Sequence, residues 1–124
     1  MNILVIDDDA DDVELFCEAL REINSDIQCH DFRKIQNAIQ YLNDSVSPPS
    51  FIFLDAHIPS SDPADFLRHI KGVNKLHGVR IVIYSGFVSD REISEFKRLG
   101  AHDVVIKPTS YDALRKRLSD LIKG

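Results

Sequence analysis

The chain has 124 residues with a formal net charge of -5, and 44% of its residues are hydrophobic while 28% are charged. This composition supports a packed core and argues against intrinsic disorder, and the length predicts one domain over residues 1–124. The acidic balance argues against direct binding to nucleic acid or to an anionic membrane, because both attract clustered Lys and Arg side chains.

Apolar runs, taken in chain order, predict the strands. Residues 3–6 form a continuous run rich in branched side chains, which is typical of a strand covered on both faces in a parallel sheet. Similar runs follow at 51–54, 80–84 and 104–106, and residues 27–29 form a shorter fifth candidate. No run is long enough to span a bilayer, and carboxylates follow the first run too soon for a signal peptide. We therefore expect a cytoplasmic protein.

Between these runs, apolar residues recur at the spacing of amphipathic helices. We expect helices over 13–23 and 35–42, a third capped by Asp62 with Pro63 in its first turn, a fourth capped by Asp90, and a fifth after the capping-box pair Thr109 and Asp112. Gly100 is placed to end the fourth helix in the left-handed conformation.

Alternating strands and helices favour one fold class. Right-handed crossovers between successive strands give a parallel sheet with helices on both faces. We expect an α/β fold, a doubly wound five-stranded parallel sheet of order 2-1-3-4-5 flanked by five helices. Cys17 and Cys29 lack the spacing of a CxxC pair and the His neighbours of a zinc site, so we interpret them as small core residues.

Polar residues follow the strands at the edge where such sheets bind ligands. Asp7 and Asp8 follow the first strand, Asp55 the third, Ser85 the fourth and Lys107 the fifth. Three neighbouring carboxylates repel one another unless a cation compensates them, and Mg²⁺, with Mn²⁺ as an alternative, suits hard oxygen ligands. An Asp carboxylate can act as a nucleophile toward phosphorus, while an ammonium and a hydroxyl neutralise the transferred group. The pattern predicts metal-dependent phosphoryl transfer.

Four segments in the order of these strands resemble the response-regulator receiver domain of two-component signalling: Ile3 to Asp9, Phe53 to Pro59, Val82 to Gly86, and Gly100 to Pro108. The resemblance spans essentially the whole chain. It implies a flavodoxin-like receiver fold and a signalling switch that accepts a phosphoryl group on Asp55 from a histidine kinase or phosphotransfer protein. Its output would pass to a downstream protein target through protein–protein contacts.

The resemblance also implies roles for the remaining site residues. Asp8 would bind Mg²⁺ directly and Asp7 through water, and the backbone carbonyl of His57 would be a further metal ligand. Ser85 and Lys107 would hold phosphoryl oxygens. In this family the bond that follows the Lys, here to Pro108, is usually cis, and we expect the same.

Two positions depart from the common receiver pattern. Val104 replaces the aromatic residue that receivers commonly carry three positions before the Lys, so we predict that any signal leaves through residues 85–87 and the helix after them. Phe87 and His57 occupy positions that flank the approach to the acyl phosphate in receivers. Their bulk leads to the hypothesis of a long-lived phosphorylated state, and the alternative is that Phe87 is an exposed partner contact.

Two other functions compete with this interpretation. Asp7 and Asp9 with a later Ser and Lys weakly resemble a Mg²⁺-dependent phosphohydrolase of the haloacid dehalogenase family, in which Asp7 would be the nucleophile and Asp55 would have no role. A receiver-like binding module that is never phosphorylated is the third hypothesis. The receiver hypothesis describes a signalling domain that catalyses its own phosphoryl transfer and slow dephosphorylation, so classification as an enzyme stays open.

Overall fold

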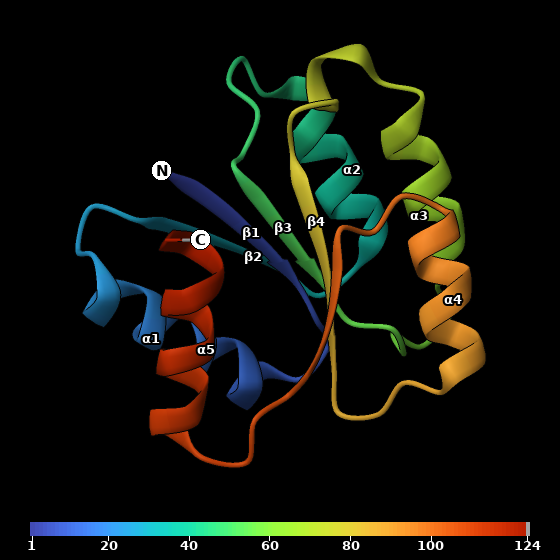
Figure 1. Ribbon diagram of the computed structural model, residues 1–124. Helices are drawn as coiled ribbons and strands as arrows, with labels where there is room; N and C mark the ends of the chain where they lie inside the picture. The colour runs from blue at the N-terminus through green and yellow to red at the C-terminus, as the bar shows by residue number, and fades with distance from the viewer. Residues whose placement is uncertain (124) are drawn as a thin grey trace.

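The computed structural model describes residues 1–123 and has the expected α/β architecture, with one sheet between two layers of helices (Figure 1). Five parallel strands are arranged in the order β2-β1-β3-β4-β5, which confirms the predicted topology. The strands are β1 (Asn2–Ile6), β2 (Gln28–Phe32), β3 (Phe51–Leu54), β4 (Arg80–Ser85) and β5 (Asp103–Ile106).

Five α-helices connect and cover the strands. They are α1 (Ala10–Ile23), α2 (Ile35–Asp44), α3 (Pro63–Lys71), α4 (Asp90–Arg98) and α5 (Tyr111–Lys123), and a short 3₁₀ helix, η1 (Asn74–Leu76), precedes β4. Helices α1 and α5 pack on one face of the sheet, and α2, α3 and α4 pack on the other (Figure 1). Within residues 1–123, no helix combines the length and apolar character that crossing a membrane requires.

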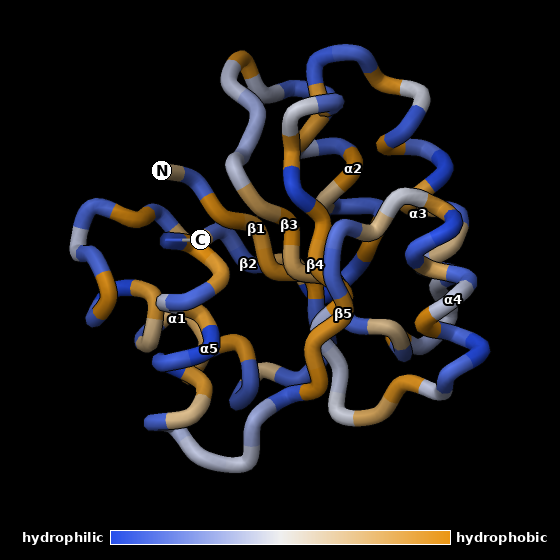
Figure 2. Tube along the Cα trace, viewed as in Figure 1, coloured by the Kyte–Doolittle hydropathy of each residue, from blue (hydrophilic) through white to orange (hydrophobic). Residues whose placement is uncertain are grey.

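The sheet divides the hydrophobic core into two halves. Along β1, Leu4 and Ile6 point into the core under α2, α3 and α4, while Ile3 and Val5 point into the core under α1 and α5. All four of these side chains are buried, which is why this strand reads as an unbroken apolar run rather than an alternating one. The strands accordingly form the hydrophobic centre of the chain trace in Figure 2.

Backbone hydrogen bonds extend the sheet into the residues that follow its strands. The amide of Asp55 donates to the carbonyl of Ile6 at 3.0 Å, and the amide of Lys107 donates to the carbonyl of Ser85 at 2.9 Å. The register pairs Ile6 with Leu54, so Asp7 and Asp55 leave adjacent strands at the same level. The backbone under the predicted site is therefore held by the sheet itself.

Some predicted element ends are wrong by one or more residues. Ser89, not Asp90, caps α4, because its hydroxyl and Glu92 form a complete capping box. Similarly, the Ser110 hydroxyl accepts from the amide of Ala113 at the start of α5, at 3.1 Å. Strand β2 spans Gln28–Phe32, whereas residues 27–29 were predicted. The prediction was too short because β2 is an edge strand, and its polar, partly exposed residues do not form an apolar run.

Two covalent features differ from expectation. Cys17 on α1 and Cys29 on β2 form a disulfide, with their Cα atoms 5.7 Å apart. Cys17 is buried in the core under α1 and α5, and Cys29 is partly buried against that core. Their pairing was not anticipated because the contact depends on how α1 packs beside β2. No peptide bond among residues 1–123 is cis, so the prediction of a cis bond before Pro108 is wrong. The trans preference of an X–Pro bond is only about 0.5–1 kcal/mol, and a short motif does not decide it.

Gly100 provides a test of the backbone that ends α4. Its φ of 111° lies in a region that L side chains rarely adopt, although an added Cβ would meet no atom within 4 Å. We predict that Gly100→Ala lowers the free energy of unfolding by about 1 kcal/mol through backbone strain alone. Chemical denaturation measures this change. Gly78→Ala is the matched control, because an added Cβ there also meets nothing within 4 Å and φ is not positive; an equal loss in both variants would contradict the account.

Candidate functional site

Three of the predicted site residues form an acidic cluster at the carboxyl ends of the strands. One carboxylate oxygen from each of Asp7, Asp8 and Asp55 lies within 4.8 Å of the others. Asp7 and Asp55 are 1% and 7% exposed, whereas Asp8 is exposed to solvent. The burial of two carboxylates follows from their position at the ends of the buried strands β1 and β3. Without compensation, charges held this closely would favour protonation of one member.

Lys107 compensates this cluster from the end of β5. Its Nζ atom lies 2.7 Å from Oδ2 of Asp7, 2.9 Å from Oδ2 of Asp12 and 3.2 Å from Oδ2 of Asp55. The ring of Tyr84 lies 5.6 Å from the same nitrogen, near enough for a cation–π contact. Sequence reasoning did not identify Asp12 as part of the site. No motif marks it, because its contact with Lys107 depends on the direction in which the first turn of α1 leaves β1.

Hydrogen bonds orient the carboxylate of Asp55. Its Oδ1 accepts from the backbone amide of His57 at 2.9 Å and from the Ser85 hydroxyl at 2.8 Å. Its Oδ2 accepts from Lys107. Asp7 is held in a similar manner, since its Oδ1 accepts from the amide of Asp9 at 3.0 Å. The structure thus brings Ser85 and Lys107 to Asp55, as the sequence predicted.

The two buried carboxylates differ in their affinity for a proton. Burial raises the pKa of Asp7 to about 6, although hydrogen bonds from Lys107 and Asp9 act in the opposite direction. Burial also acts to raise the pKa of Asp55, but the hydrogen bonds from His57 and Ser85 and the charge of Lys107 outweigh it, so the pKa of Asp55 is lowered. Burial acts to lower the pKa of Lys107, but its contacts with Asp7 and Asp12 raise that pKa overall. Asp55 is therefore the ionised nucleophile candidate.

His57 makes side-chain contacts that the sequence did not indicate. Its Nε2 lies 2.9 Å from Oε2 of Glu92 on α4, and its Nδ1 lies 3.4 Å from the Ser85 hydroxyl. Glu92 is 35 residues away in the chain, and no local pattern could have paired the two. The backbone carbonyl predicted as a metal ligand belongs to this same residue, whose amide already contacts Asp55.

The two departures from the receiver pattern have distinct environments. Val104 is partly buried and packs against the core under α2, α3 and α4. Phe87 is 70% exposed, so most of its ring faces solvent rather than covering a neighbour. This exposure favours the interpretation of Phe87 as a partner contact over the hypothesis that it shields Asp55.

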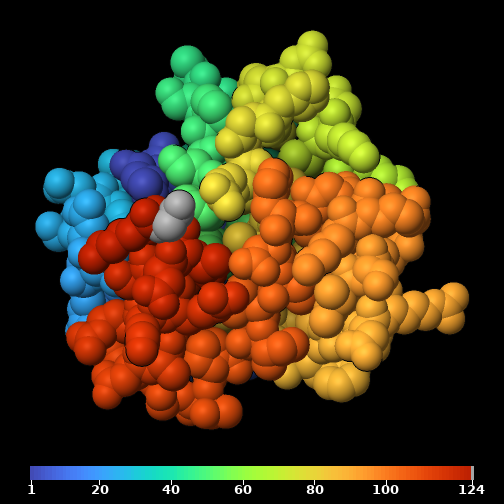
Figure 3. Space-filling view, in the orientation of Figure 1, coloured from blue at the N-terminus to red at the C-terminus, as the bar shows by residue number. Residues whose placement is uncertain are grey.

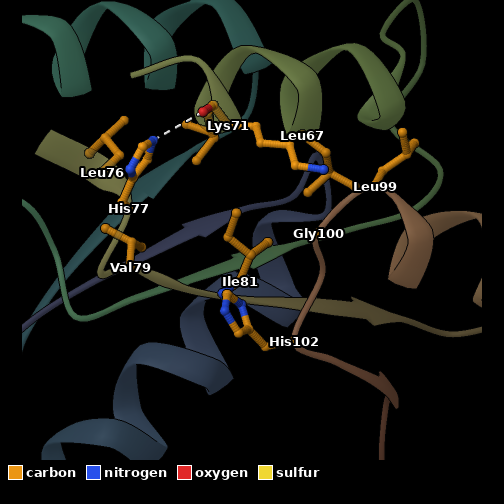
Figure 4. A pocket seen from close by; sticks show the side chains of 10 residues that line it. Leu67, Lys71, Leu76, His77, Val79, Ile81, Leu99, Gly100 and His102 are labelled. Carbon is orange, nitrogen blue, oxygen red and sulfur yellow. Dashed lines mark hydrogen bonds between the residues drawn. The ribbon is translucent and has the colours of Figure 1, made fainter. Parts of the chain in front are cut away.

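A separate cavity lies at the opposite end of the sheet. It has a volume of about 170 Å³ between the ends of α3 and α4 and the start of β4 (Figure 4). Its lining is mainly aliphatic, with no acidic residue among the residues that define it. His77 and His102 are engaged with the backbone, since the ring of His77 lies 3.1 Å from the carbonyl of Lys71 and Nδ1 of His102 accepts from the amide of Ile81. The residues that line this cavity therefore lack the carboxylates that meet at the other end of the sheet.

The sequence matches one protein family. Residues 3–119 match the family described as the response regulator receiver domain. No curated protein sequence matches the chain with significance. The family match covers the four segments that carried the resemblance and, apart from Asn2 at the start of β1, all of the strands described above.

Solved structures of receiver proteins share the fold. The phosphorylated cyanobacterial phytochrome response regulator RcpA superposes with a TM-score of 0.87 at 22% identity, covering 98% of this chain and 91% of that one. The Mn²⁺-bound response regulator Rcp1 gives 0.82 at 21% identity, with 97% and 90% covered. The chemotaxis response regulator CheY4 of Vibrio cholerae gives 0.81 at 17% identity, with 97% of each chain covered. At these identities, the similarity establishes the fold.

The raised pKa of Asp7 leads to a stability prediction for the metal-free protein. Above a pH of about 6 the folded protein must hold an ionised Asp7 in a buried site, which costs free energy relative to the unfolded chain. We therefore predict that Asp7→Asn raises the free energy of unfolding by about 1–2 kcal/mol at pH 7 in EDTA. The gain should shrink as the pH falls through 6, and vanish below the ordinary Asp pKa, because the native carboxyl is then protonated.

Urea denaturation at several pH values measures this effect. Asp103→Asn serves as a control, because that carboxylate lies 40% exposed beside Arg117. A destabilised Asp7→Asn protein at pH 7, or a gain that grows on acidification, would contradict the electrostatic account of the cluster.

Proposed function

This chain belongs to the response regulator receiver domain family, and we propose that it is a Mg²⁺-dependent phosphorylation switch whose phosphoacceptor is Asp55. The observation that carries this assignment is the set of contacts around that one carboxylate. Asp55 has a lowered pKa, a hydroxyl donor on one oxygen and the Lys107 ammonium on the other. A carboxylate that stays ionised while charge-neutralising groups surround it suits nucleophilic attack on phosphorus.

In the proposed reaction, an Asp55 oxygen attacks the phosphorus of a phosphohistidine on a histidine kinase or phosphotransfer protein. The P–N bond breaks as the P–O bond forms, the electron pair leaves with the imidazole, and Asp55 becomes an acyl phosphate. Ser85 and Lys107 already contact Asp55, so both can donate to the phosphoryl oxygens without a large rearrangement. Their charge and hydrogen bonds oppose the negative charge that phosphoryl transfer brings into the site.

The metal would bind at the acidic cluster. The oxygens of Asp7, Asp8 and Asp55 are close enough to share one ion, and hard oxygen donors with an exposed member suit Mg²⁺, which keeps several waters. When bound, Mg²⁺ would supply positive charge between the carboxylates and the phosphoryl oxygens. We assign Asp8 and the His57 carbonyl as direct ligands, and Asp7 as a ligand through water. Mn²⁺ is an alternative ion, and Rcp1, which shares the fold, has been solved with Mn²⁺ bound.

The remaining assignments concern the extent of the domain, where it works and how it passes on its signal. We propose that residues 1–124 form a single receiver domain that works in the cytoplasm and passes its signal to a downstream protein. With Val104 in place of an aromatic residue, the signal would leave through residues 85–87 and α4. This route is supported by the exposed ring of Phe87, which lies two residues before the Ser89 cap of that helix in the sequence. Helix α4 and the segment that follows it form much of the face shown in Figure 3. A partner protein could therefore contact this surface and detect a change in α4.

The two rival functions have no specific support in the site. A dehalogenase-type hydrolase needs Asp7 as its nucleophile, but Asp7 is 1% exposed, and its two oxygens already accept from Lys107 and from the amide of Asp9. A module that is never phosphorylated would not need Asp55 to be aligned by Ser85 and Lys107. Neither rival explains why these groups converge on Asp55.

Labelling with radioactive acetyl phosphate tests the proposal. We predict Mg²⁺-dependent incorporation of about one phosphoryl group per chain, because a small acyl phosphate can replace the phosphohistidine donor. The label should be absent from Asp55→Asn and from the native protein in EDTA. Asp65→Asn is the matched control, since that carboxylate pairs with Arg68 on the surface of α3. Undiminished labelling of Asp55→Asn would overturn the assignment, and continuous hydrolysis that depends on Asp7 would establish the hydrolase instead.

A further inference from the structure

Glu92 links the start of α4 to the loop that carries Asp55. Its Oε1 accepts from the amide of Ser89 at 3.0 Å, which completes the capping box of α4. Its Oε2 lies 2.9 Å from Nε2 of His57, two residues after Asp55. One carboxylate therefore serves as a helix cap and as the partner of a residue beside the phosphoacceptor.

The contacts continue from His57 to Asp55. Nδ1 of His57 lies 3.4 Å from the Ser85 hydroxyl, which donates to Oδ1 of Asp55 at 2.8 Å. The single Ser85 proton is directed at Asp55, and the N–H of a neutral imidazole is used at Nε2 toward Glu92, so the longer contact between Ser85 and His57 is not a strong hydrogen bond in this state. A series of polar contacts thus runs from Asp55 through Ser85 and His57 to Glu92 and the first turn of α4.

We propose that His57 and Glu92 couple the occupancy of Asp55 to the N-terminal cap of α4, with His57 acting as a positioning residue that changes partner. This inference rests on the proposed function, because it requires a phosphoryl group on Asp55. It identifies the contact by which the signal reaches α4 in a chain that has Val104 where an aromatic side chain is common in receivers.

The physical basis is competition for one imidazole ring. Phosphorylation replaces the single negative charge of the Asp55 carboxylate with about two on the phosphoryl group, and it brings three strong acceptor oxygens next to Ser85. A neutral imidazole has a single N–H, which can be donated from Nε2 to Glu92 or from Nδ1 toward the phosphoryl oxygens but not to both. A phosphoryl group on Asp55 therefore draws the His57 ring toward Asp55 and away from Glu92. Glu92 then loses the contact with His57 that helps to hold its carboxylate in place. As a result, the capping box that Glu92 shares with Ser89 opens more often.

The expected change is moderate because the pair is partly exposed. The side chains of His57 and Glu92 are 49% and 34% exposed. Exposed pairs of this kind alter an equilibrium by up to about fivefold. Such a change suits a reversible switch, since it alters how often the first turn of α4 opens without unfolding the helix.

Amide hydrogen exchange in the first turn of α4 tests the proposal. The probes are the amides of Glu92 and Ile93, which donate to the hydroxyl and the carbonyl of Ser89. Exchange is compared in Mg²⁺ alone and in Mg²⁺ with saturating beryllofluoride, a mimic of the phosphoryl group, and ¹⁹F NMR counts the bound mimic. In the native protein, occupancy should accelerate exchange of these amides by about twofold to fivefold.

Three variants separate the effect of the contact between His57 and Glu92 from the effect of the capping box. Glu92→Ala removes both the contact with His57 and the capping box, so exchange should be fast even without the mimic. Its response to occupancy should stay below about 1.5-fold, less than the smallest response expected of the native protein. Ser89→Ala breaks the same capping box from its other side but keeps the pair with His57, so its baseline should rise while the native response remains. His57→Phe keeps an aromatic ring at position 57 but removes its hydrogen bonds. In this background, adding Glu92→Ala should not change further how amide exchange responds to occupancy.

The outcomes distinguish this inference from the function on which it rests. A native-sized response in Glu92→Ala, or no response in the native protein despite full ¹⁹F occupancy, would overturn the coupling while leaving Asp55 as the acceptor. Loss of the response in Ser89→Ala to the same extent as in Glu92→Ala would show that only the cap matters, which also overturns it. Absence of bound mimic in the native protein would instead contradict the proposed function, and this inference with it.

Discussion

The structure depends on one ammonium group held among three carboxylates. Lys107 contacts Asp7, Asp12 and Asp55 from the end of β5, and without it the sheet would place two buried negative charges side by side. The sheet cannot relax this arrangement, because the backbones of Asp7 and Asp55 are fixed by hydrogen bonds to Phe32 and Ile6 on neighbouring strands. The fold therefore imposes a concentration of negative charge at this edge, and a cation must oppose it.

This constraint explains why the site suits a reversible modification. Asp7 is buried with its pKa raised to about 6, whereas Asp55 is held ionised by an amide, a hydroxyl and the ammonium. The two carboxylates thus divide their roles by environment rather than by residue type. One acts as the proposed partner of a metal and the other as the proposed nucleophile. The groups that keep Asp55 ionised are also those that can hold a phosphoryl group once it arrives.

Sequence reasoning recovered the features set by strand periodicity and order. The parallel sheet and the meeting of Asp7, Asp8, Asp55, Ser85 and Lys107 at one edge follow from apolar runs and from the residues after them. The strand order, which was selected among the orders possible for such a sheet, is confirmed. What it missed depends on side-chain direction between elements that are distant in the chain. The contact of Asp12 with Lys107, the pairing of His57 with Glu92 and the disulfide between Cys17 and Cys29 each require the packed positions of the helices. Caps were misassigned where two candidates stood side by side, as with Ser89 and Asp90.

The most direct measurement of the central claim is the chemical identification of the modified residue. Sodium borohydride reduces an aspartyl phosphate to homoserine, so peptide mass spectrometry after phosphorylation and reduction locates the acceptor without reliance on a variant. The account predicts homoserine at position 55, at a yield that follows the phosphorylated fraction and falls to background in EDTA. Homoserine at position 7 or 8, or a phosphorylated protein with none at position 55, would contradict it.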